Sequence, residues 1–115
     1  MKDNNIVILD NKEVIVKQHK QDIWLFIDAN SNYVMEVITK DDIIEYCKRE
    51  LRDTDISTMC ADILIENVWY YIQQELCRDN MTLQGFSKFS TWFDYVCVEC
   101  FSNELVSHYY KNRLL

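Results

Sequence analysis

The fold is decided by residues 33–51, which read YVMEVITKDDIIEYCKREL. The first six of these residues are mostly β-branched, aromatic or otherwise apolar, as in many strands. Thr39, followed three positions later by Asp42, has the form of a capping box, with Asp in place of the usual Glu or Gln. From Ile43 onward, apolar residues recur every four positions, which is a helical period. The stretch therefore predicts a strand that passes directly into a helix ending near residue 52.

Upstream of this stretch, short apolar runs predict three further strands, at Ile6–Leu9, Val14–Val16 and Ile23–Ile27. The segments 10–12 and 28–32 contain the Asp and Asn residues that tolerate the left-handed backbone of tight turns. The segment 17–21 is polar, and we expect it to be a loop. Because short connections favour antiparallel neighbours, the N-terminal part is predicted to be a β-meander of three or four strands.

Downstream, the chain reads as helical. After a break at residues 53–55, a helix is predicted over residues 56–77. Its apolar stripe consists of Cys60, Leu64, Val68, Ile72 and Leu76, widened by Ile63 and Trp69.

A last helix is predicted to start at a cap formed by Thr91 and Asp94 and to end near residues 111–113. One of its faces carries Phe93, Cys97, Phe101, Leu105 and Tyr109. Residues 82–89 fit either a short helix or a loop. The chain is thus predicted to be one α+β domain over residues 1–115, with strands over about 6–38 and three or four helices over about 40–113 packed on them.

The composition favours a small intracellular domain and excludes a membrane-spanning helix and a glycine-rich phosphate loop. The 115 residues suit one domain, and five cysteines without a secretion signal favour reduced thiols inside a cell. No apolar run approaches the roughly 20 residues that span a bilayer, so no membrane contact is expected. We expect a cytoplasmic protein, in the host cytoplasm if a phage encodes it. With one glycine and no proline, a glycine-rich phosphate loop is excluded.

Chemical motifs are few. Cys97 and Cys100 form a C-x-x-C pair, but it falls inside a predicted helix and no second pair completes a zinc site. We interpret both as apolar core residues, with a zinc or redox role as the alternatives. His108 follows Cys100 by eight residues, which places the two at different helical angles. We therefore predict no catalytic residue, no cofactor and no metal, and keep an enzyme of unfamiliar type in reserve.

Charge is the more informative feature. The formal net charge is −7, which disfavours direct binding to nucleic acid and favours a basic protein surface as partner. Between residues 58 and 110 the only Lys and Arg residues are Arg78 and Lys88. We expect the helical carboxylates to lie off the apolar stripes. The predicted partner-binding residues on the two long helices are Asp62, Glu66, Tyr70, Gln73, Asp94, Tyr95, Glu99 and Asn103.

These features favour a small acidic binding protein that inhibits a basic nucleic-acid-handling partner by occluding its positively charged site. Anti-CRISPR and anti-restriction proteins of phages, and immunity proteins of toxic nucleases, have this compositional profile. The alternative is a structural or regulatory homo-oligomer, such as a homodimer, with an aromatic-rich interface. It is motivated by a set of aromatic residues that is large for one small core: Trp24, Tyr33, Trp69, Tyr70, Tyr71, Trp92, Tyr109 and Tyr110.

Overall fold

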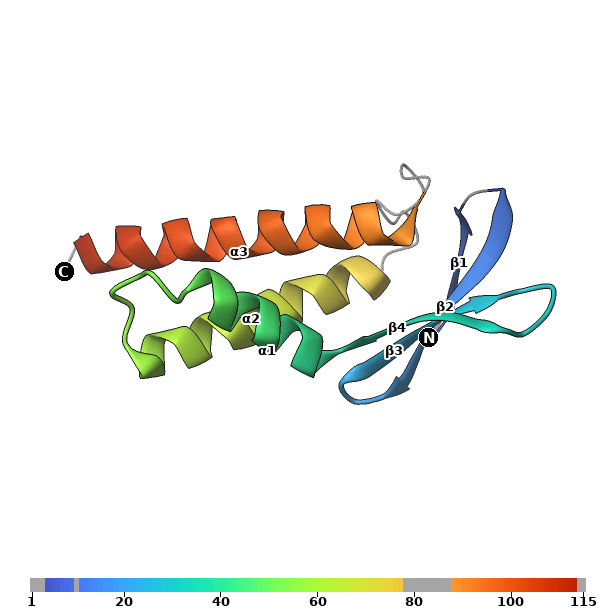
Figure 1. The fold of residues 1–115 in the computed structure, drawn as a ribbon, viewed down its shortest axis with the longest axis horizontal. Coiled ribbons are helices and arrows are strands. Elements are labelled where there is room, and N and C mark those ends of the chain that lie inside the picture. Colours follow the sequence, from blue (N-terminus) through green and yellow to red (C-terminus); the bar gives the residue numbers. More distant parts are fainter. Residues whose placement is uncertain (1–3, 10, 78–87, 114–115) are drawn as a thin grey trace.

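The computed structural model describes residues 4–9, 11–77 and 88–113. A four-stranded sheet is followed by three helices, which confirms the α+β prediction. The strands are β1 (Asn4–Leu9), β2 (Lys12–Lys20), β3 (Ile23–Asp28) and β4 (Val34–Thr39). The helices are α1 (Lys40–Glu50), α2 (Thr58–Cys77) and α3 (Phe89–Arg113). The sheet lies at one end of an elongated molecule, and the three helices lie side by side at the other (Figure 1).

The strands form the predicted meander, with each strand antiparallel to the next. Asn11 and Asn32 adopt positive φ angles of 62° and 60° in the turns that the sequence placed there. The carboxylate of Asp28 accepts hydrogen bonds from the backbone of Asn30 (2.8 Å) and Ser31 (3.3 Å), which closes the third turn. Asp and Asn suit such turns because their side chains can accept hydrogen bonds from nearby backbone N–H groups.

The expected loop at residues 17–21 is mostly strand. β2 continues to Lys20, and its polar residues Lys17 and Gln18 pair with Leu25 and Trp24 of β3. The prediction was wrong because pairing is made by the backbone, whereas the polar side chains of this part of β2 stay in solvent.

The two faces of the sheet differ. The inner face packs on the helices, and its buried residues are Val7, Leu9, Val14, Val16, Trp24, Phe26 and Ile38. The strand register places eight aliphatic residues on the opposite, outer face: Ile6, Ile8, Ile15, Ile23, Leu25, Ile27, Val34 and Val37. None of these eight is buried. The outer face also carries three charged residues of β2: Glu13 and Lys17, which lie on either side of Ile15, and Lys20, which pairs with Ile23 at the end of the strand.

The strand passes into α1 as the sequence predicted. The Thr39 hydroxyl accepts a hydrogen bond from the backbone of Asp42 (3.3 Å), and the Asp42 carboxylate accepts one from the backbone of Thr39 (2.9 Å). Ile43 and Cys47 of α1 are then fully buried. The capping box fixes the direction in which the chain leaves the sheet.

The stripe of α2 is largely as predicted, with Leu64, Val68, Trp69, Ile72 and Leu76 buried. The widening on the Ile63 side is wrong, because Ile63 is 58% exposed and Ile65 is buried in its place. Cys60 is half-buried, since it lies in the first turn of the helix.

Helix α3 differs more from the prediction. It begins at Phe89, so Thr91 lies inside the first turn and the predicted Thr91–Asp94 cap is wrong. Its buried residues include Trp92 and Val96 as well as the predicted Cys97 and Phe101. The face is displaced because the start of α3 also packs on the sheet: the ring of Phe26 lies 4.7 Å from that of Phe89 and 6.0 Å from that of Trp92. Residues 82–87 and the Tyr109 side chain lie outside the described parts.

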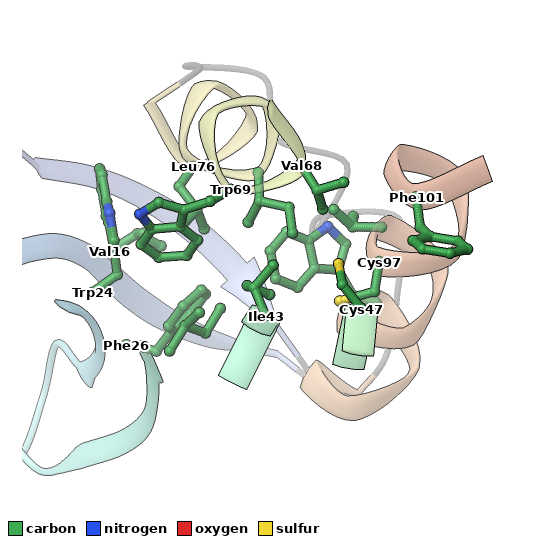
Figure 2. Close-up of a cluster of buried hydrophobic side chains, with 14 of the residues drawn as sticks. Val16, Trp24, Phe26, Ile43, Cys47, Val68, Trp69, Leu76, Cys97 and Phe101 are labelled. Atoms are coloured by element: carbon green, nitrogen blue, oxygen red, sulfur yellow. The ribbon is translucent and has the colours of Figure 1, made fainter. Parts of the chain in front are cut away.

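One continuous core joins the two halves (Figure 2). Two indole hydrogen bonds tie the sheet to α2: Trp24 Nε1 donates to Gln73 Oε1 (3.2 Å), and Trp69 Nε1 donates to Asp22 Oδ1 (3.0 Å). These two tryptophans and Trp92 are buried. The core therefore holds all three tryptophans that motivated the prediction of an aromatic interface.

Candidate functional site

A groove of about 510 Å³ runs between α2 and α3. Helix α2 contributes Tyr71, Gln74 and Glu75 to its lining. Helix α3 contributes Tyr95, Val96, Glu99, Cys100, Asn103, Glu104 and Ser107. The groove therefore combines three carboxylates and two phenol rings, with no Lys or Arg among these lining residues.

The helical repeat explains why these side chains converge. Tyr95, Glu99 and Asn103 follow one another at intervals of four residues, so they form a ridge along one side of α3. Cys100, Glu104 and Ser107 form the neighbouring row, closer to the core. On α2, Tyr71 and Glu75 are also four residues apart. The packing of α2 against α3 brings the three rows to one groove.

The electrostatics of the groove favour a cationic guest. A side-chain hydrogen bond with Glu99 raises the pKa of Tyr95. Burial, together with the neighbouring Glu99, Glu75 and Glu104, raises the pKa of the Cys100 thiol to about 11. Cys100 is therefore protonated at neutral pH, which is the opposite of what a nucleophilic cysteine requires.

The structure separates the residues that the sequence placed in one partner-binding set. Tyr95, Glu99 and Asn103 line the groove, whereas Asp94 does not. None of the four residues predicted on α2 lines it, although the Tyr70 ring packs edge-on against that of Tyr71, with centroids 5.5 Å apart.

Three of the residues predicted on α2 face a side of that helix away from the groove: Asp62, Glu66 and Gln73. Glu66 forms an ion pair with Lys40 of α1, and this contact raises the pKa of Lys40. Gln73 is half-buried and holds the indole of Trp24. Asp62 is exposed one turn before Glu66. The Glu66 and Gln73 contacts attach α2 to α1 and to the sheet.

Sequence reasoning missed Glu75 and Glu104 as site residues, because helical acids were expected off the apolar stripes. Both are half-buried. Glu75 follows the buried Val68 by seven residues, and Glu104 follows the buried Cys97 by seven, which is two helical turns in each case. Glu75 and Glu104 could therefore have been predicted from their seven-residue spacing to an apolar residue of each stripe.

The cysteines belong to the core. Cys47 and Cys97 are buried, and their sulfur atoms lie close together where α1 meets α3 (Figure 2). Burial raises the pKa of each of these two thiols to about 12. In the described ranges, no group of three or more His, Cys, Asp or Glu residues is arranged to hold a metal ion. His108 is half-buried and does not line the groove with Cys100.

None of the helices in the described part of the chain has the length and apolar character needed to cross a membrane. Comparisons with protein-family models, with curated proteins and with solved structures find no match to this chain.

Proposed function

We propose that this protein is a non-enzymatic binding protein whose α2–α3 groove receives a Lys or Arg side chain from a basic partner. The observation that carries the proposal is the convergence of Glu75, Glu99 and Glu104 with Tyr71 and Tyr95 in one groove. Carboxylates pair with cationic side chains, and a phenol ring attracts a cation over its face. Because the groove is formed by two packed helices, little conformational entropy is lost when it is filled.

The partner class follows from the charge of the surroundings. Helix α2 carries Asp62, Glu66 and Glu75 and no Lys or Arg. A surface of this kind is attracted to sites rich in Lys and Arg, which on many proteins hold the phosphates of a nucleic acid. We therefore propose a nuclease or another nucleic-acid-handling protein as the partner. Binding would inhibit it by competition for the phosphate site, as anti-CRISPR, anti-restriction and immunity proteins could do.

The test is affinity capture of partners with three forms of the chain. One is unaltered, one carries Glu75→Gln, Glu99→Gln and Glu104→Gln, and the matched control carries Glu45→Gln, Asp53→Asn and Asp55→Asn, which are exposed on α1 and the segment after it. Both variants lose the same charge. The groove variant should lose a basic partner that the control retains, with binding about 100-fold weaker, since each charge-assisted contact is worth about 1 kcal/mol.

The identified partner is then assayed with its nucleic-acid substrate. The proposal predicts inhibition that is overcome by excess nucleic acid and by salt. It would be contradicted by a partner that both variants bind equally well, or by inhibition that excess nucleic acid leaves unchanged.

A further inference from the structure

The outer face of the sheet has no counterpart within the described parts of the chain. An antiparallel sheet that faces water on one side normally carries polar residues there. Here the register joins Ile6 to Ile15 and Ile15 to Ile27, so that apolar side chains run across three strands. Ile6 is 63% exposed, and Ile8 and Val37 are 48% and 46% exposed. A contiguous apolar patch of this kind usually marks an interaction site.

We propose that this face binds the same face of a second copy of the chain, forming a two-fold symmetric dimer. The inference is independent of the groove and of its partner. Its basis is the placement of the charges on the face, where Lys20 lies at one end, opposite Ile23. Glu13 and Lys17 flank the aliphatic centre, two residues before and two residues after Ile15 on the same strand. Neither forms a salt bridge with another described residue.

These two charges make the face complementary to itself. Consider a two-fold axis that lies between the two sheets, crosses the strands and passes at the level of Ile15. It reverses the direction of β2, so Glu13 of each copy stands opposite Lys17 of the other. Sheets stack at about 10 Å, a gap that the two side chains can bridge together. The pairing therefore forms two ion pairs around an aliphatic centre.

Charge and size both fit a second copy. Although the whole chain has a net charge of −7, residues 11–39 carry three lysines and four carboxylates, which leaves −1 for this part of the sheet. Two sheets can therefore approach while the acidic helices stay apart. Four strands of about six residues form a face of roughly 20 by 20 Å. Stacking two such faces removes on the order of 1,000 Å² from water, near the lower limit for a specific interface.

The test is sedimentation velocity over about 5–500 µM, since an interface of this size gives a dimer in the micromolar range. The mass should rise from 13.9 kDa towards twice that value. Ile6→Lys should weaken dimerisation about tenfold or more by placing a charge in the apolar patch. The matched control is Ile63→Lys on α2, where the isoleucine is similarly exposed at 58% and dimerisation should not change.

Charge reversal at Glu13 and Lys17 gives a second and stricter test of the dimer. Glu13→Lys alone, or Lys17→Glu alone, creates like-charge contacts at both ends of the interface and should weaken the dimer about tenfold. The double swap Glu13→Lys with Lys17→Glu restores opposite charges and should return the affinity to within about threefold of the unaltered chain. Circular dichroism confirms that each variant is folded. A chain that stays monomeric, a dimer indifferent to Ile6→Lys, or a double swap that fails to restore affinity would each overturn the proposal.

Discussion

The sheet half and the helical half of this molecule share one core but present different chemistry to solvent. The sheet is close to neutral and exposes an aliphatic outer face, whereas α2 and the groove are acidic and lined with tyrosine. The core that joins them is continuous, from Val16 on β2 to Phe101 on α3. One small domain therefore keeps two surfaces of unlike chemistry apart, because each belongs to its own half, and each surface can be altered separately.

The largest effect should come from breaking the joint between the halves. Trp92 is fully buried against Phe26 of the sheet and Phe89 of α3. Trp92→Ala should reduce the free energy of unfolding by about 3–5 kcal/mol, because it leaves a large cavity. Tyr33→Ala, which truncates a 66% exposed aromatic residue, is the control and should cost less than about 1 kcal/mol.

Urea unfolding followed by circular dichroism measures both changes. If the sheet and the helices share one cooperative core, the Trp92→Ala transition remains single. Two separate transitions, or equal losses in both variants, would mean that the two halves are held together in another way.

Alkaline pH should weaken the helical half. Burial raises the pKa of Cys47 and Cys97 from 9.0 to about 12, so between these values the folded state keeps two protons that the unfolded state releases. The free energy of unfolding must then fall as pH rises above about 9, by roughly 2–3 kcal/mol at pH 10 for the two thiols together.

Urea titrations at pH 7, 9 and 10 test this dependence. The double variant Cys47→Val and Cys97→Val carries no thiol at these two positions and should show a distinctly flatter profile. A loss of stability at pH 10 that is identical in both proteins would assign the effect to other groups.

A smaller effect should separate the two threonines that the sequence interpreted as helix caps. Thr39 forms the capping box where the sheet passes into α1, and Thr39→Ala should cost about 1 kcal/mol. Thr91 lies inside the first turn of α3, so Thr91→Ala should be neutral or slightly stabilising, since alanine is the better helix former. Thermal unfolding of the two variants, measured side by side, compares their losses of stability. Equal losses would contradict the observed start of α3.

The sequence was most informative where structure is local. The β-branched run Val14–Val16, the asparagines of the turns and the Thr39–Asp42 cap each depend on a few neighbouring residues. The start of α3 and its buried Trp92 depend on contact with Phe26, more than 60 positions earlier. No helical repeat contains that information.

The candidate site shows the same division. Tyr95, Glu99 and Asn103 could be predicted as one row, because they share one side of one helix. Their partners on α2 could not, because the face of α2 turned towards α3 depends on how the helices pack. Of the predicted α2 residues, Glu66 pairs with Lys40 and Gln73 holds the indole of Trp24.

We propose that the α2–α3 groove, and not the acidic surface as a whole, receives a cationic side chain. The most direct measurement is a nuclear magnetic resonance titration of the labelled protein with a short arginine-rich peptide, at low and at high salt. We predict that the largest shifts fall on Tyr71, Glu75, Tyr95 and Glu99 and that they weaken as salt is added. Shifts spread evenly over exposed carboxylates such as Glu45 and Asp53, or confined to the sheet, would contradict it.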